Sequence, residues 1–368
     1  MNIKDLIKFS IIPLIVFVFI AAILWSTEKY LAYQYDKRFL SSIFKKRFIY
    51  LRNLPPNQHL TFNSSDIPQV DSFKIKIKDY TCTTDSNGFI VSGKMHQHPD
   101  LKFVFLGGSI PQSLYTDEDK RMPVAVTRET ERLTGLKINV WNAAAGGTNS
   151  YHTLNVLNNM ALQLKPDYAF FYGNINDIAT LIHYGSFNNP NLKWGIFFNT
   201  RKFDDENRPV DNFLPYIQNV IKNELYQKPI QDDFADVRDT VISIDSAQLS
   251  MAVKQVFKTM IAVCKANNIK PVLITQVNIY DRMGFEWMKK NMPLLTISED
   301  GYQKLVQLFA NYNDLLRQVA DEEDVSFIDL KSNEFSFSDF NEPSHFNGDG
   351  YVKVNTMIAH KFSAIVKY

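Results

Sequence analysis

The sequence predicts a doubly wound α/β domain with a mainly parallel sheet of five strands, an aromatic-rich insertion and an N-terminal transmembrane helix. Short runs of β-branched and aromatic residues alternate with longer segments whose apolar residues recur at helical spacing. This alternation is typical of a parallel sheet covered by helices on both faces. A single long uncharged apolar run lies near the N-terminus. The 368 residues suffice for one large domain with appendages or for two domains.

The N-terminal apolar run, residues 9–25, contains no charged residue, and Ser10 is its only polar side chain. At about 1.5 Å per residue it spans roughly 25 Å, close to the hydrocarbon core of a bilayer, which is about 30 Å thick. A buried core helix would carry a polar stripe, and a cleavable signal peptide would end in a small-x-small site. The run has neither. We therefore interpret residues 1–30 as a single-pass anchor in the cytoplasmic membrane.

Two opposing arguments bear on the orientation of this anchor. Lys4 and Lys8 precede the run, whereas more basic residues follow it, including a cluster at 45–47, so the positive-inside rule would keep the body in the cytoplasm. Long domains that follow an anchor, however, are translocated largely regardless of charge. We favour an exported body, with residues 31–80 as a juxtamembrane segment and linker that contains Pro55-Pro56.

Five strands and three long helices are predicted within residues 81–368. Each strand is a short apolar run that ends in a loop of small or polar residues, and each helix has apolar residues at helical spacing. The predicted strands are residues 102–106, 138–141, 168–172, 271–275 and 325–330, and the predicted helices are residues 251–265, 301–319 and 350–366.

Two insertions interrupt this alternation. The longer one, residues 181–241, is rich in Phe, Tyr and Asn, and a structureless loop of that length is uncommon in a compact domain. We interpret it as a partly helical lid or substrate-binding cap. The shorter one, residues 278–300, carries aromatic residues after the fourth strand, and most of them are expected to pack the insertion onto the body rather than to contact a ligand.

The composition argues against several classes of partner and cofactor. The 40 Lys and Arg residues nearly balance the 39 Asp and Glu residues, so no global field favours nucleic acid. Cys82 and Cys264 have no neighbouring Cys or His at metal-ligand spacing, which argues against a zinc site and a disulfide framework. Cys264 lies in the apolar pattern of a helix and is interpreted as a buried thiol, although the two cysteines could pair in an oxidising compartment.

Four residues that could take part in catalysis fall in loops after predicted strands: Ser109, Gly147, Asn176 and His345. In an open parallel sheet, ligands bind outside the carboxyl ends of the strands, so these residues are expected at one edge. Taken singly, each has an ordinary explanation, such as a tight turn or a helix cap. Together they supply what acyl transfer needs, which is a serine hydroxyl, a base to activate it, and N–H donors for the oxyanion.

The loops that hold these residues resemble the sequence blocks of the SGNH (GDSL-like) hydrolases, in the variant with Gly-Gly-Ser in place of Gly-Asp-Ser. The resemblance extends from about residue 81 to the C-terminus, interrupted by the 181–241 insertion, and it implies a flavodoxin-like SGNH fold. The upstream Asn87-Gly88-Phe89 looks like the lead-in of membrane-associated members. The four blocks are Val104–Ser109, Asn142–Tyr151, Gly173–Asp177 and Glu342–His345.

The resemblance implies a role for each residue. Ser109 is the nucleophile and His345 the general base, which takes the serine proton and returns it to the leaving alcohol. The N–H groups of Ser109 and Gly147 and the side-chain amide of Asn176 form the oxyanion hole. No metal and no organic cofactor is implied.

The acid of the triad departs from the family pattern. Glu342 stands where the family usually has Asp, and it is expected to orient His345, as Glu does in some triads. Asp339, a few positions earlier, is the alternative. Ser113 and Asn174 also differ from the residues common in the family, and they could narrow the pocket.

The function expected from this resemblance is a serine esterase that acts on O-acyl esters, in particular O-acetyl esters, of a cell-envelope glycan or lipid. One alternative is an O-acyltransferase with the same site, in which a sugar hydroxyl captures the acyl-Ser109 intermediate. Another is a non-catalytic glycan-binding or assembly protein that retains the fold. Product analysis with and without an acceptor sugar separates the first two.

Overall fold

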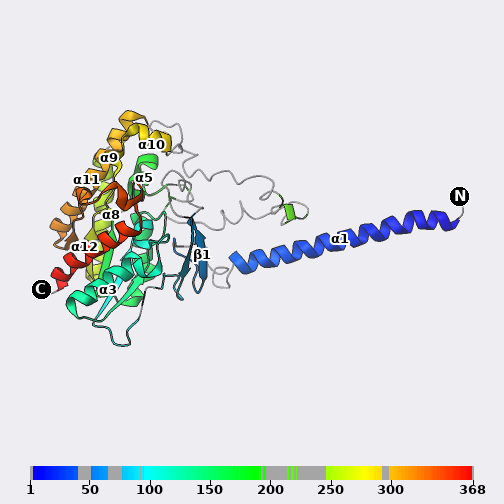
Figure 1. Ribbon diagram of the computed structural model, residues 1–368, viewed down its shortest axis with the longest axis horizontal. Helices are drawn as coiled ribbons and strands as arrows, with labels where there is room; N and C mark the ends of the chain where they lie inside the picture. The colour runs from blue at the N-terminus through cyan, green and yellow to red at the C-terminus, as the bar shows by residue number, and fades with distance from the viewer. Residues whose placement is uncertain are drawn as a thin grey trace. The chain divides into compact units, whose positions relative to one another are not determined.

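The computed structural model divides the chain into two compact units, Met1–Tyr50 with Phe198–Asp233, and Leu51–Phe197 with Phe234–Tyr368. Most of the 181–241 insertion, which we predicted to be a lid, and residue Asn174 lie outside the described residues. The structure describes residues 3–39, 51–64, 77–91, 93, 95–173, 175–189, 191, 194–195, 214, 217–218, 221, 246–291 and 298–366 (Figure 1).

The N-terminal helix α1 (Ile3–Phe39) contains the predicted apolar run. Its segment Pro13–Gln34 has 22 residues and a mean hydropathy of 1.7, and within the described chain it is the one helix that could cross a membrane by length and composition. At about 1.5 Å per residue these 22 residues span roughly 33 Å, enough for a hydrocarbon core. A signal sequence would have the same properties, so the helix supports the membrane anchor without establishing it.

The second unit is built on a parallel sheet with the order β4-β3-β5-β6-β7. Neighbouring strands pair in parallel throughout, for example with Phe105 opposite Asn142 and with Tyr172 opposite Ile274. This is the 2-1-3-4-5 order of flavodoxin-like folds, in which the chain reverses its direction across the sheet after the first strand pair. The predicted fold class is therefore confirmed. The strands are β3 (Leu101–Leu106), β4 (Ile138–Asn142), β5 (Tyr168–Tyr172), β6 (Lys270–Ile274) and β7 (Ser326–Ile328).

Helices cover both faces of the sheet (Figure 1). Side chains alternate along β3, so Val104 and Leu106 join the core under α4, α5, α8 and α11, whereas Phe103 and Phe105 join the core under α3 and α12. Burying one such side chain stabilises the fold by about 1.5–3 kcal/mol, and strands buried on both faces read as continuous apolar runs. The helices are α2 (Ser109–Gln112), α3 (Met122–Thr134), α4 (Ser150–Asn159), α5 (Ile175–Tyr184), α8 (Ser246–Ala266), α11 (Glu299–Glu323) and α12 (Gly348–Val366).

A small antiparallel pair that the sequence analysis did not predict joins β1 (His59–Asn63) to β2 (Asp79–Thr83). Strand β1 lies in the stretch 31–80 that we interpreted as juxtamembrane segment and linker. The compact unit that contains the sheet begins at Leu51, so it includes part of that stretch. Leu60 and Phe62 alternate with polar residues, but the run is only five residues long and its side chains are exposed or half-buried, so we assigned it to the polar linker.

The remaining elements lie in the loops at the ends of the longer ones. The second insertion forms α9 (Tyr280–Met283) and α10 (Phe285–Asn291), and Tyr280 stacks on Phe309 with 5.0 Å between the ring centroids, as the packing interpretation expects. Both cysteines are free and buried. The other elements are the 3-10 turns Glu118–Lys120, Ala161–Leu164, Ser332–Glu334 and Phe337–Asp339, and the hairpin of β8 (Phe340–Glu342) and β9 (His345–Phe346).

Candidate active site

Ser109 opens helix α2 directly after strand β3, at the carboxyl edge of the sheet. The preceding Gly107 has φ +144, and a Cβ there would lie 3.0 Å from Pro111 Cγ and 3.3 Å from the Tyr172 carbonyl oxygen. Only glycine fits such a turn without displacing its neighbours. The turn leaves Ser109 half-buried at the end of the strand, where a hydroxyl can meet a ligand.

A histidine from the other end of the chain contacts this serine. Ser109 Oγ lies 2.5 Å from His345 Nε2. His345 Nδ1 is hydrogen-bonded to Glu342 Oε1 across the β8–β9 hairpin. When the Nδ1–H donates this hydrogen bond to the carboxylate, Nε2 is left without a proton and can accept the serine proton. This is the arrangement of a nucleophile, its base and the acid that orients the base.

The interaction between His345 and Glu342 favours the charged form of both side chains and outweighs the opposing effect of their burial. Burial lowers the pKa of His345, but the charge and hydrogen bond of Glu342 outweigh it, so the pKa is raised from its ordinary 6.5. Burial raises the pKa of Glu342, but His345 and hydrogen bonds from Ser344 outweigh it, and the net shift is downward. The His345 side chain keeps 37% of its surface exposed, so a substrate can reach it.

The structure distinguishes between the two candidates for the acid. Asp339 accepts a hydrogen bond from the Ser336 N–H at 2.8 Å and pairs with Lys353 Nζ at 3.1 Å. Its carboxylate stabilises the turn before the hairpin. Glu342, three residues before His345, is the carboxylate that contacts the imidazole.

The loop after β4, which holds one predicted oxyanion donor, lies beside the serine, and a second predicted donor is bonded to that loop. Gly147 has φ +69 in the loop after β4, and a Cβ on its neighbour Gly146 would lie 3.9 Å from Ser109 Cβ, so this loop faces the nucleophile. Within the described chain, neither the Ser109 N–H nor the Gly147 N–H has a hydrogen-bond acceptor. Asn176 Nδ2 donates to the Thr148 carbonyl at 3.0 Å, which ties the start of α5 to the same loop.

Comparisons with known proteins give a likeness in fold only. No family model matches the chain, and no curated protein matches it. Among solved structures, it is similar to the acetyl xylan esterase AlAXEase, with 16% identity and a TM-score of 0.39 over 72% of this chain and 100% of that one. It is also similar to a GDSL-like lipase from Bacteroides thetaiotaomicron, with 16% identity and a TM-score of 0.38 over 74% of this chain and 92% of that one. A third similar structure is an acetyl xylan esterase from Geobacillus stearothermophilus, with 11% identity and a TM-score of 0.44 over 72% of this chain and 94% of that one.

Sequence identities and TM-scores this low do not assign the fold, which therefore rests on features of the chain itself. The sheet has the 2-1-3-4-5 order, the serine follows its first strand, and the histidine precedes the last helix. The chain has an SGNH-like hydrolase fold. Of the five predicted site residues, three are in direct contact, namely Ser109, His345 and Glu342.

Asp177, which the sequence analysis named only as the end of the third block, links two helices at this edge of the sheet. Its buried carboxylate accepts hydrogen bonds from the Ser150 N–H at 2.6 Å, from Ser150 Oγ, and from the Tyr312 hydroxyl at 2.5 Å. Burial raises the pKa of Asp177 to about 6, although these hydrogen bonds lower it. The carboxylate thereby joins the start of α4, which follows the Gly147 loop, to the start of α5, whose first turn contains Asn176 rather than the loop position that the sequence predicted.

His152, which also lies near this edge, is a structural residue. Its Nδ1 accepts the Asn149 N–H at 3.3 Å, and its Nε2 bonds to the Gly195 carbonyl. Burial, with a smaller contribution from Arg52, lowers the pKa of His152 to about 4. The imidazole is therefore neutral at pH 7 and fastens the 194–195 segment to helix α4.

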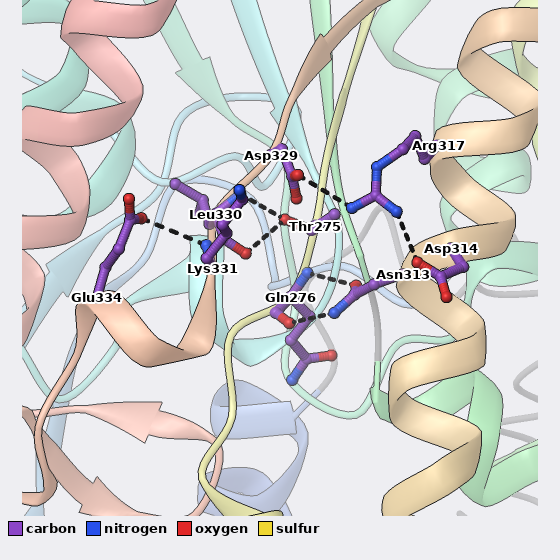
Figure 2. Close-up of polar contacts among 9 residues, drawn as sticks. All are labelled: Thr275, Gln276, Asn313, Asp314, Arg317, Asp329, Leu330, Lys331 and Glu334. Carbon is purple, nitrogen blue, oxygen red and sulfur yellow. Dashed lines mark hydrogen bonds and ion pairs between the residues drawn. The ribbon is translucent and has the colours of Figure 1, made fainter.

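The neighbouring strand ends are held together by side chains that bond to the backbone (Figure 2). Thr275 Oγ1 accepts from the Leu330 N–H at 2.7 Å and donates to its carbonyl at 3.1 Å, and the Asn313 amide bonds to both backbone groups of Gln276. A Cβ on Gly173 would lie 3.0 Å from the Gln276 nitrogen. The Gln276 side chain is buried, and in the described chain its polar atoms have no hydrogen-bond partner. No sequence signal pointed to it.

Proposed function

We propose that the protein is a serine esterase that hydrolyses O-acyl esters, in particular O-acetyl esters, of a cell-envelope glycan or lipid. The observation that carries this proposal is the 2.5 Å contact between Ser109 Oγ and His345 Nε2, with Glu342 on the far side of the imidazole. A serine hydroxyl that bonds to an oriented imidazole is the arrangement that acyl transfer requires.

The reaction follows from this geometry in two halves. His345 Nε2 takes the Ser109 proton while Oγ attacks the acyl carbon, and the carbonyl oxygen becomes an oxyanion that the Ser109 and Gly147 N–H groups and the Asn176 amide stabilise. The oxyanion collapses, and the imidazolium gives its proton to the departing alcohol. A water molecule then attacks the acyl-serine with the same imidazole as base, which releases the acid and restores Ser109.

The class of substrate rests on the proposed anchor. We propose that α1 holds the body in the cytoplasmic membrane with the active site on the outer side, where esters of envelope glycans and lipids are within reach. Adding protease to intact spheroplasts tests this topology. The body should be digested without detergent, and protection of the body would place it in the cytoplasm.

The chemical proposal is tested with the full-length protein in detergent. A fluorophosphonate probe should label the wild type, and labelling and 4-nitrophenyl acetate hydrolysis should disappear in Ser109→Ala and His345→Ala. Ser250→Ala, which removes a hydroxyl that donates to the Ser246 carbonyl within helix α8, serves as the matched control and should behave as the wild type. Absence of labelling in the wild type would favour a non-catalytic binding protein.

Product analysis then distinguishes hydrolysis from transfer. An O-acetylated oligosaccharide is incubated with the protein, with and without an unacetylated acceptor sugar. Release of acetate at the same rate in both reactions supports the esterase. Acetylation of the acceptor at the expense of acetate release would instead show an O-acyltransferase, because the two activities differ in whether water is excluded from the acyl-serine.

A further inference from the structure

The peptide between Gly146 and Gly147 faces the nucleophile. A Cβ on Gly146 would lie 3.9 Å from Ser109 Cβ and 3.1 Å from Gln112 Oε1, so this stretch of backbone approaches the serine closely. The Gly147 N–H belongs to the same peptide, and it has no acceptor in the part of the chain that the structure describes. The direction of this N–H depends on how the peptide plane is held.

Arg52 bonds to the other side of that peptide. Its Nε–H donates to the Gly146 carbonyl oxygen at 3.1 Å. The Gly146–Gly147 peptide is trans, so its carbonyl and its N–H point in opposite directions. A donor bound to the carbonyl therefore sets where the Gly147 N–H points, and a cation at that position polarises the peptide and strengthens the N–H as a donor.

The charge of Arg52 persists at physiological pH. Burial lowers its pKa to about 10, which is still well above 7. A partly desolvated cation interacts more strongly with a carbonyl dipole than an exposed one, because less water screens it.

The segment that carries Arg52 packs against the Asn87-Gly88-Phe89 turn, which the sequence analysis compared with the lead-in of membrane-associated family members. Asn53 Nδ2 donates to the Asn87 carbonyl at 3.1 Å. Gly88 has φ +82, and a Cβ there would lie 2.0 Å from the Leu54 carbonyl oxygen. Only glycine allows this approach, so the Asn87-Gly88 turn and the residues after Arg52 form one packed unit.

We propose that Arg52 is a positioning residue for the oxyanion hole. It orients the Gly146–Gly147 peptide so that the Gly147 N–H points at the oxyanion formed when Ser109 attacks. The inference rests on the proposed function and goes beyond it, because it assigns a part in the reaction to a residue 94 positions before Gly146 and outside the four sequence blocks.

Kinetics of Arg52 variants separate positioning from a purely structural role. Arg52→Gln should lower kcat for 4-nitrophenyl acetate by about ten- to a hundredfold, somewhat less than loss of an oxyanion donor, with KM within about twofold. The rate of Ser109 labelling by fluorophosphonate should fall by a similar factor, and thermal unfolding should change little. Arg52→Lys should recover part of the loss, because the ammonium can donate to the same carbonyl. Arg128→Gln, at an exposed arginine, is the control and should match the wild type.

Several outcomes would overturn the inference. One is a kcat for Arg52→Gln equal to that of Arg128→Gln, and another is a loss that appears only in KM or only in thermal stability. If Arg52→Gln does not fold, Arg52→Met keeps the apolar stem and carries the same comparison. If the wild type neither hydrolyses esters nor reacts with the probe, the proposed function fails separately. A crystal structure of the variant then decides the positioning, because an unchanged Gly146–Gly147 peptide would refute it.

Discussion

Replacing Glu342 by Gln removes the negative charge beside His345 and keeps an oxygen that can accept a hydrogen bond from the Nδ1–H. In the wild type, burial lowers the pKa of His345, and the charge and hydrogen bond of Glu342 more than offset this. Without the charge, the effect of burial remains, so the pKa should fall below 6.5. Because the base acts in its neutral form, the rising limb of the pH–rate profile should move from above pH 6.5 to below it.

The plateau rate should fall as well, because the transition state contains an imidazolium that has lost its partner. Removing one member of a buried ion pair costs about 3–5 kcal/mol, which corresponds to roughly two to four orders of magnitude in rate. The side chain of His345 is 37% exposed, and water therefore compensates part of the lost charge. We expect the lower end, a loss of about a hundredfold.

The assay is kcat for 4-nitrophenyl acetate between pH 5 and pH 9, for the wild type, Glu342→Gln and Asp339→Asn. Asp339→Asn is the matched control, because this carboxylate pairs with Lys353 and bonds to the Ser336 N–H. It should retain both the rate and the pH profile. A larger loss in Asp339→Asn, or an unchanged limb in Glu342→Gln, would refute the assignment of the acid.

Four further predictions follow. Ser109→Ala should abolish ester hydrolysis and leave thermal unfolding unchanged, since it removes one half-buried hydroxyl. Turnover at the wild-type rate would exclude Ser109 as the nucleophile. Gly146→Ala should lower turnover roughly tenfold or more, because its methyl group would lie 3.1 Å from Gln112 Oε1 and displace that side chain beside Ser109, and Gln112→Ala in the same protein should restore part of it. His152 has a pKa of about 4 in the fold against 6.5 ordinarily, so the unfolded chain binds more protons between these pH values. The free energy of unfolding should therefore decrease as the pH falls from 6.5 to 4, by up to about 3 kcal/mol, and urea titrations of His152→Gln should lack this contribution. Finally, the chain without residues 1–50 should be monodisperse without detergent in size-exclusion chromatography, and a detergent requirement would argue against a single span.

The fold class could be read from the sequence because its elements are encoded locally. The run 168–172 was predicted with the bounds that β5 has, since a strand buried on both faces is a short apolar run between polar loops. Helices α8 (Ser246–Ala266) and α11 (Glu299–Glu323) extend beyond the predicted 251–265 and 301–319 by between one and five residues at their ends, as is usual where the apolar pattern fades. Strand β1 was missed although Leu60 and Phe62 alternate with polar residues, because this short run lies in a stretch that we interpreted as a polar linker.

The sequence by itself determined that Ser109 and His345 lie at one edge of the sheet. In a parallel sheet every strand ends at the same edge, so chain order and strand ends are enough to bring the following loops together. Only the tertiary structure decided that Glu342 rather than Asp339 contacts the imidazole, because both precede His345 in one loop and the β8–β9 hairpin turns one of them toward it. It alone brought Arg52 to the Gly146 carbonyl, since a contact across 94 residues depends on packing and leaves no periodic pattern in the chain.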